Sequence, residues 1–234
     1  RLGAEKVSAC SAETGGGATA GVRPPVKGYL KRIREICDQY GVVMILDEVM
    51  AGFGRPGRWL ALDDFDVVPD LITFAKGVNS GYVPAGGVMI SRPIAEFFDD
   101  RVFPGGLTYS GHPLALAAIV ATLTAMDEED VVGNARRLGE DVIGPTLRAL
   151  AAKHDVIGEV RGVGAFWALD LVEDAATRSP LPAATMGQIK AALIARGLLP
   201  FIADNRIHVV PPCVMTPEDA VEGLGIIDEV LGSL

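Results

Sequence analysis

The sequence is poor in cysteine and has no long apolar run. Its three cysteines, Cys10, Cys37 and Cys213, are far apart and odd in number, a pattern that indicates neither a disulfide framework nor a Cys-x-x-Cys metal site. We therefore expect a protein of the reducing cytoplasm. There is no stretch of about 18 apolar residues, and the first ten residues lack the basic-then-apolar pattern of a signal peptide. These two absences predict no association with a membrane.

The sequence also has a deficit of positive charge. Lysine and arginine number 21 against 30 acidic residues, which gives a net charge of -9. Nucleic-acid phosphates and anionic lipids would be repelled over much of such a surface, so we expect no nucleic-acid partner. The hydrophobic fraction of 49% and the charged fraction of 22% are those of an ordinary globular protein. A chain of 234 residues is long enough for one large or two modest domains.

Two apolar runs each end on an ionisable group. Residues 42–46 are unbroken and rich in β-branched side chains, as in a strand buried on both faces of a parallel sheet, and they lead into Asp47 and Glu48. Residues 71–74 predict a second short strand, which leads to Lys76. Ligands of open α/β sheets bind just outside the carboxyl ends of the strands. We therefore expect Asp47 and Lys76 to meet at one edge of a sheet.

A lysine beside a carboxylate commonly forms a simple salt bridge, and that interpretation stays open. The glycine-rich stretch 77–87 favours a second one, because glycines permit tight turns and close backbone approach to a bound group. Lysine amines form Schiff bases with aldehydes. An aspartate opposite such an amine is suited to hold a protonated ring nitrogen, and the two groups together match the needs of pyridoxal phosphate.

Residues 45–61, ILDEVMAGFGRPGRWLA, and residues 69–91, PDLITFAKGVNSGYVPAGGVMIS, closely resemble the signature of the class III (subgroup II) aminotransferases. These ω-aminotransferases are pyridoxal-phosphate enzymes of fold type I. The resemblance implies that Lys76 forms a Schiff base with the cofactor and that Asp47 pairs with its ring nitrogen. It also implies that Val49 packs on the face of the ring.

Two further segments can be compared with the family: the first matches it at Glu13 and departs from it afterwards, and the second is similar to it. Residues 5–12 predict a buried strand that ends at Glu13, and residues 14–21 form a glycine-rich stretch without a GxGxxG motif or a Walker lysine, which favours a flexible loop over a phosphate cradle. Residues 103–113, FPGGLTYSGHP, are similar to a family segment, which implies that Thr108 binds the cofactor phosphate of a neighbouring subunit. The resemblance thus implies a homodimer or a dimer-based tetramer. A capping loop for the following helix is the alternative.

Arg206 stands at the start of a predicted strand, where an arginine commonly bridges surface carboxylates. The resemblance of DNRIHVVPP to the family implies instead that Arg206 grips a substrate carboxylate in two hydrogen bonds. It implies also that Glu13 pairs with Arg206 when the substrate end is uncharged. A separate acidic cluster consists of Asp63, Asp64 and Asp66. It lacks EF-hand spacing, so we expect a solvated turn and no metal site.

The resemblance implies an α/β fold. Residues 1–138 would belong to the fold type I large domain, with a mostly parallel sheet and flanking helices, and residues 139–234 would form a small α+β domain. Helical periodicity and cap signals predict the helices, and apolar runs bounded by glycine and proline predict the strands. The predicted helices are 28–40, 113–126, 131–154, 183–195 and one after Thr216; further strands are predicted at 87–90, 156–162, 165–171, 197–201 and 206–210.

The implied activity is transfer of an amino group from an ω-amino acid or amine, such as taurine, β-alanine or 4-aminobutyrate, to a 2-oxo acid such as pyruvate or 2-oxoglutarate. The resemblance covers only the C-terminal portion of a family member, and it leaves out a Gly-Ser phosphate site and an aromatic residue stacked on the ring. We therefore expect weak or no activity from this chain alone. The alternatives are a non-catalytic α/β interaction or dimerisation domain, and a pyridoxal-phosphate racemase or decarboxylase on the same scaffold.

Overall fold

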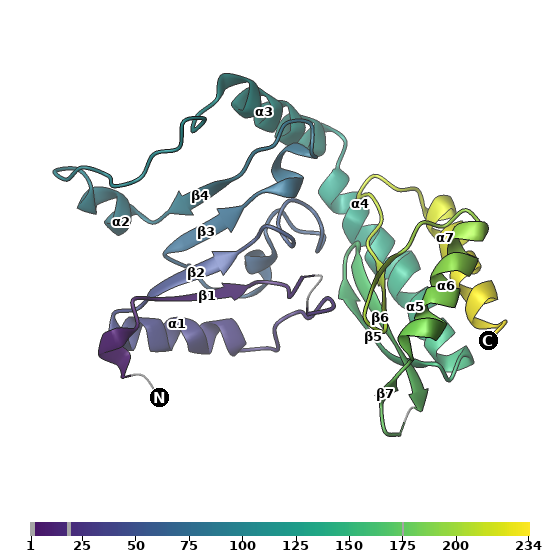
Figure 1. Cartoon of the computed structure of the whole chain (residues 1–234). Helices are drawn as coiled ribbons and strands as arrows, with labels where there is room; N and C mark the ends of the chain where they lie inside the picture. The colour runs from purple at the N-terminus through teal and green to yellow at the C-terminus, as the bar shows by residue number, and fades with distance from the viewer. Residues whose placement is uncertain (1–2, 18–19, 175) are drawn as a thin grey trace. The chain divides into compact units, whose positions relative to one another are not determined.

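The computed structural model describes residues 3–17, 20–174 and 176–234. They pack into two compact units, each with its own sheet (Figure 1). This division falls before the boundary predicted between residues 138 and 139, and the assignment of two domains stays a prediction. Unit 1 comprises Arg1–Gly15, Pro25–Phe53 and Trp59–Asp130, and unit 2 comprises Gly16–Pro24, Gly54–Arg58 and Val131–Leu234.

Unit 1 contains a four-stranded sheet in the order β1-β2-β3-β4. The first three strands are parallel and the last is antiparallel, which confirms a mostly parallel sheet. Helix α1 covers one face of this sheet (Figure 1), and it ends at Gly41, whose left-handed backbone is that of a C-cap glycine. The bounds are β1 (Ala9–Glu13), α1 (Tyr29–Tyr40), β2 (Val43–Asp47), β3 (Leu71–Phe74) and β4 (Gly87–Ile90).

Two predictions for this sheet were wrong in part. The first strand begins at Ala9 and not at residue 5, because its pairing partner begins at Val43 and a short 3-10 turn, η1 (Ala4–Lys6), precedes it. Strand β2 is buried on one face only: Met44 and Leu46 are fully buried against the α1 side, while the alternate residues are half-buried.

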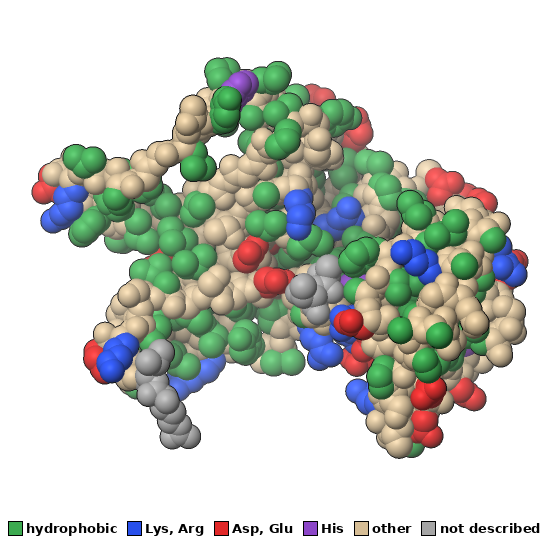
Figure 2. Space-filling model, in the orientation of Figure 1, with side chains coloured by type: hydrophobic (Ala, Val, Ile, Leu, Met, Phe, Trp, Pro, Cys, Tyr) green, Lys and Arg blue, Asp and Glu red, His purple; other side chains and the backbone are tan. Residues whose placement is uncertain are grey.

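The rest of unit 1 is helical and has an exposed apolar surface. Val88 and Met89 on β4 and Leu114 and Val120 on the long helix α3 are all exposed, and Figure 2 shows hydrophobic side chains gathered over the β4 and α2 region. Helix α3 packs against the 3-10 turn η3 that begins at Lys76. The remaining elements are η2 (Ala61–Asp64), η3 (Lys76–Asn79), α2 (Arg92–Phe97) and α3 (Pro113–Glu128).

Unit 2 is an antiparallel sheet with helices packed on one face (Figure 1). Its core joins Leu147, Leu169, Leu193, Ile207 and Ile227, and confirms the α+β character of the C-terminal part. The strands are β5 (Ile157–Val163), β6 (Phe166–Asp174), β7 (Ser179–Pro180), β8 (Phe201–Ala203) and β9 (Arg206–Val209), in the order β5-β6-β9-β8 with β7 beside β6. The helices are α4 (Val131–Arg137), α5 (Gly144–Lys153), α6 (Ala183–Ala195) and α7 (Pro217–Leu231).

The helix predicted over 131–154 contains a π turn at residues 138–143, between α4 and α5. Two features account for it. A Cβ added to Gly139 would lie 2.2 Å from the main-chain oxygen of Gly164, so the backbones there are in close contact. Pro145 has no N–H to continue a regular α-helical hydrogen-bond ladder.

The strand predicted at 197–201 was wrong in its bounds. Gly197 has a φ of +88° and ends α6, and Pro200 lacks the N–H that a strand would donate, so β8 begins only at Phe201. The closing helix was predicted well: Thr216 accepts a hydrogen bond from the Asp219 N–H at 3.1 Å, and Pro217 follows as the first helical residue. Among the described residues, no helix combines the length and apolar composition needed to cross a bilayer.

Candidate active site

The parallel strands of unit 1 bring three predicted site residues to the same edge of the sheet. Glu13 and Asp47 are the last residues of β1 and β2 and lie opposite each other in the register. Asp47 lies in turn opposite Thr73 of β3, and Lys76 follows three residues later. The carboxyl edge of a parallel sheet is where open α/β folds bind their ligands.

Asp47 is held in place through both its main chain and its side chain. One carboxylate oxygen, Oδ1, accepts a hydrogen bond from the Val49 N–H at 2.8 Å. The main-chain oxygen of Asp47 accepts from the N–H and the hydroxyl of Thr14, each at 3.3 Å. The half-buried Val49 therefore lies next to the Asp47 carboxylate, and both residues were predicted to contact the cofactor ring. This end of the strand is preorganised before any ligand arrives.

Lys76 has an unusual backbone. Its φ is +47°, in the left-handed region that non-glycine residues seldom occupy, and such strain is concentrated at functional sites. The side chain is exposed, and its Nζ lies 2.6 Å from Sδ of Met50, three residues after Asp47. The lysine amine thus reaches back to the segment that follows Asp47.

Glycines next to Lys76 allow the segments at this edge to approach one another. A Cβ added to Gly77 would lie 3.0 Å from Cβ of Phe53, and one added to Gly86 would lie 2.8 Å from the main-chain oxygen of Phe74. Both contacts are between segments of the protein, and the predicted close approach of this glycine-rich stretch to a bound group stays a prediction. Larger residues at either position would push Lys76 and its neighbours apart.

Glu48 follows Asp47 in the sequence and has a structural role that the sequence did not predict. Its side chain is fully buried and accepts hydrogen bonds from the N–H groups of Ala61 and Leu62, at 3.0 and 2.8 Å. Burial raises the pKa of this carboxyl group, and the two N–H groups oppose that shift only in part. Glu48 fixes the start of η2 to the end of β2. Its place directly after a buried strand was the only available signal.

Main-chain contacts define part of the loop predicted at residues 14–21. Thr14 is buried, and Gly16 and Arg23 exchange main-chain hydrogen bonds at 3.0 and 3.1 Å. The flexibility of this loop stays a prediction. Residues 18 and 19 of the predicted loop lie outside the described residues.

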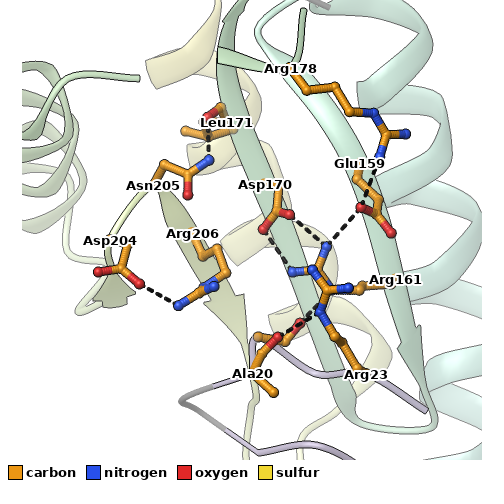
Figure 3. A network of polar contacts seen from close by, with 11 residues as sticks. Ala20, Arg23, Glu159, Arg161, Asp170, Leu171, Arg178, Asp204, Asn205 and Arg206 are labelled. Carbon is orange, nitrogen blue, oxygen red and sulfur yellow. Dashed lines mark hydrogen bonds and ion pairs between the residues drawn. The ribbon is translucent and has the colours of Figure 1, made fainter. Parts of the chain in front are cut away.

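Arg206 lies in unit 2, on the polar face of the second sheet. Residues alternate along β9, so Ile207 enters the core while Arg206 is on the opposite face, in register with Asp170 of β6. The Arg206 guanidinium donates to the Asp204 carboxylate at 2.5 Å (Figure 3). Its side chain is only 15% exposed, whereas that of Asp204 is 78% exposed. An ion pair with so exposed a carboxylate is weak and can be exchanged at little cost.

Arg161 was not singled out from the sequence, yet it is the centre of the polar contacts in Figure 3. Its guanidinium makes two hydrogen bonds to Asp170, at 2.7 and 2.8 Å, and its Nε donates to the main-chain oxygen of Gly21 at 2.5 Å. The hydrogen bonds that Arg161 donates to the Asp170 carboxylate raise the pKa of Arg161 above its ordinary value. The contact to Gly21 joins residues 140 positions apart in the chain, a separation that sequence patterns do not predict.

Two other predicted pairings stay predictions. Thr108 is exposed in the segment before α3, and its predicted partner is a phosphate bound by another subunit. Glu13 belongs to unit 1 and Arg206 to unit 2. Within the parts of the chain that the structure describes, histidine, cysteine and acidic side chains form no group of three that could hold a metal ion.

Comparisons with known proteins place this edge in a family context. Residues 1–231 match the model of the aminotransferase class-III family. The chain is 34% identical to the taurine--pyruvate aminotransferase of Bilophila wadsworthia over 91% of its length, and 37% identical to a 5-aminovalerate aminotransferase of Pseudomonas putida over 92%. It spans only 49% and 50% of those two relatives, about half of each.

Solved structures of aminotransferases are also similar to this chain. The taurine:2-oxoglutarate aminotransferase of Bifidobacterium kashiwanohense, in complex with pyridoxal phosphate and glutamate, matches 99% of this chain with a TM-score of 0.94 and 43% identity. An amine transaminase from an uncultivated Pseudomonas species, with pyridoxal phosphate bound, matches 99% with a TM-score of 0.93 and 36% identity. The chain covers 52% and 53% of these two structures.

Proposed function

Because this chain belongs to the class III aminotransferases, we propose that it is the catalytic-lysine portion of a pyridoxal-phosphate-dependent aminotransferase. The proposed donor is an ω-amino acid or amine of the taurine, β-alanine or 4-aminobutyrate type, and the acceptor is a 2-oxo acid. The observation that carries the proposal is the register of β2 and β3, which sets Asp47 and Lys76 at the same sheet edge.

The residues at this edge fit pyridoxal phosphate. When bound, the cofactor supplies an aldehyde for an amine and a ring that acts as an electron sink. Lys76 provides the amine, on a backbone that neighbouring glycines leave open to close approach. Asp47 provides a carboxylate whose direction is fixed by the Val49 N–H. We assign Val49 to the face of the ring and Thr108 to the phosphate of a neighbouring subunit.

Two side chains carry the proposed proton chemistry. With the cofactor bound, the Lys76 Nζ would take a proton from the donor carbon as a general base and would return it later as a general acid. Asp47 would hold the ring nitrogen of the cofactor in its protonated form. A preorganised charge of this kind stabilises developing negative charge without reorganisation of the site.

Arg206 is proposed to recognise the anionic end of the substrate. Its planar guanidinium suits a carboxylate or a sulfonate, and its pairing with the exposed Asp204 is readily exchanged. When the substrate end is uncharged, Glu13 is proposed to pair with Arg206 in place of a substrate anion. The named activities of the Bilophila, Pseudomonas putida and Bifidobacterium relatives support this donor class.

We also propose a homodimer, or a tetramer built from dimers, in the cytoplasm. Leu114, Leu116 and Val120 of α3 are 62%, 50% and 64% exposed, and a helix with so apolar an outer surface is suited to a subunit interface. The small number of cysteines, free in the structure, supports a reducing compartment.

Trapping of the cofactor on Lys76 tests the central assignment. The complete protein is loaded with pyridoxal phosphate, reduced with borohydride and digested, and mass spectrometry locates the modified peptide. We expect the cofactor on Lys76 and no covalent attachment in Lys76→Ala. Modification at another lysine would contradict the assignment. A complete protein that never takes up the cofactor would favour a non-catalytic interaction domain. If the donor is converted but the 2-oxo acid does not become an amino acid, a racemase or decarboxylase would be favoured.

A further inference from the structure

The Gly21 segment, residues 20–24, packs within unit 2 although it follows β1 of unit 1 in the chain. Main-chain hydrogen bonds close the segment on itself: the Gly21 N–H donates to the Gly17 oxygen at 3.0 Å, and the Arg23 N–H donates to the Gly16 oxygen at 3.1 Å. The Nε–H of Arg161 donates to the Gly21 oxygen and so links the segment to the sheet. Arg161 therefore helps to fix the position of the segment.

The Arg161 side chain is itself fixed in direction. It is only 9% exposed, and Asp170 binds its two terminal nitrogens while Glu159 lies 3.2 Å from one of them. A guanidinium is planar and its five N–H donors are rigidly placed. With its terminal nitrogens held by Asp170, the remaining Nε–H can point in one direction only, and that direction is toward the Gly21 oxygen.

Gly21 also touches Arg206. A Cβ added to Gly21 would lie 2.5 Å from Cδ of Arg206 and 2.7 Å from Nη2 of Arg161. The φ of Gly21 is +72°, which glycine adopts without strain. The backbone of Gly21 is thus in contact with the aliphatic part of one arginine while its oxygen is held by the other. Asp170, in register with Arg206, is the carboxylate beside this pair of cations.

We propose that Arg161 is a positioning residue for substrate recognition: it holds the Gly21 segment against Arg206 and so fixes where the Arg206 guanidinium presents its hydrogen-bond donors. This inference rests on the proposed role of Arg206. It makes Arg161 and Gly21 determinants of specificity for donors with an anionic end, although neither is assigned a contact with the reacting atoms.

A purely structural role for Arg161 predicts a different result from a positioning role. If Arg161 only stabilised the sheet, its loss would impair all amino donors alike. If it positions Arg206, its loss raises KM for a donor that ends in a carboxylate or sulfonate. The same loss leaves kcat nearly unchanged, and it leaves KM nearly unchanged for an amine donor without an anionic end.

The test compares Arg161→Lys with Arg178→Lys in the complete protein loaded with pyridoxal phosphate. A lysine at position 161 keeps a charge for Asp170 but lacks the Nε–H that binds Gly21. Arg178 is 69% exposed and only approaches Glu159 at 3.7 Å, so it serves as the matched control. We expect KM for 4-aminobutyrate or taurine to rise about tenfold in Arg161→Lys, with less than about twofold change for butylamine.

Gly21→Ala is the second variant, because it keeps both arginines and adds a methyl group close to Cδ of Arg206 and Nη2 of Arg161. It should raise KM for the same anionic donors. An equal rise for butylamine in both variants, or no rise for the anionic donors, would overturn the proposal.

Hydrogen exchange supplies a readout that needs no catalysis. Amides of the Gly21 segment should exchange faster in Arg161→Lys than in Arg178→Lys, while amides of β6 and α7 exchange at the parent rate. Unchanged exchange in the segment rejects the positioning role. Arg206→Ala separates the two proposals: if it leaves KM for the anionic donor unchanged, the role of Arg206 fails and this inference fails with it. If it raises KM while Arg161→Lys does not, only the inference fails.

Discussion

Asp47 and Thr73 lie opposite each other across the parallel strands β2 and β3. This pairing places the carboxylate that ends β2 at the same sheet edge as Lys76, which follows β3 by two residues. The arrangement requires no bend or bulge in either strand. The strand register therefore sets the places of the two groups to which we assign proton chemistry and charge stabilisation.

Replacement of Asp47 by alanine should slow amino transfer by about 10²- to 10³-fold, the range for loss of one preorganised electrostatic contact. The measurement is the single-turnover rate with a saturating donor in the complete, cofactor-loaded protein. Asp99→Ala, an exposed carboxylate at the end of α2, is the control and should keep the parent rate. A rate in Asp47→Ala that matches the control would refute the role of Asp47.

Replacement of Glu48 by alanine should lower the free energy of unfolding of unit 1 by about 2 to 4 kcal/mol, because it leaves the Ala61 and Leu62 N–H groups buried without an acceptor. Urea titration monitored by circular dichroism measures the change. Glu35→Ala removes a surface ion pair with Arg32 and should cost less than about 1 kcal/mol. Equal losses in the two variants would contradict the anchoring role of Glu48.

Asp70 should make unit 1 sensitive to acid. Burial favours a higher pKa for this carboxyl group, but hydrogen bonds from the Met44 N–H and from Arg34, both at 2.7 Å, outweigh burial and lower the pKa below 3.8. A lowered folded-state pKa means that the stabilisation is present above the unfolded pKa and is lost as the pH falls through the folded value.

The measurement is the urea midpoint between about pH 6 and about pH 3, a range that spans carboxyl titration. The parent should lose stability toward the acid end more steeply than Asp70→Asn. Asp38→Asn, whose side chain is 66% exposed, should follow the parent. Parallel curves for all three proteins would show that Asp70 carries no such dependence.

Thr216→Ala should destabilise unit 2 by about 0.5 to 2 kcal/mol, because the Asp219 N–H loses its acceptor at the start of α7. Thermal unfolding of parent and variant gives the difference. Thr216→Ser keeps the hydroxyl and should restore most of the stability; if it destabilises as much as alanine, the hydroxyl is not the source.

The sequence predicted best the elements whose ends carry local signals. Gly41 marked the end of α1, and Thr216 with Pro217 marked the start of α7. The apolar runs correctly placed Asp47 at the end of one strand and Lys76 shortly after another, because the signal and the structure there are local. The residue at which β1 begins depends on its pairing partner β2, so residues 5–8 were wrongly assigned to a strand.

The contacts that sequence did not predict are those between distant segments. Glu48 reaches a turn 13 and 14 residues away, and Arg161 reaches Gly21 across 140 residues. Nothing in the composition near these residues reports the partner. The π turn has the same origin, since it follows from the contact of Gly139 with Gly164 and not from helix propensity.

The π turn at residues 138–143 holds one residue more per turn than the α-helices on either side of it. An α-helix advances about 100° per residue, so an extra residue in a regular helix would rotate every later side chain by that angle. The wide turn absorbs the extra residue, and Leu147 and Leu150 enter the core. A residue inserted into α5 ahead of Leu147, with no second wide turn to absorb it, would rotate both leucines away from the core.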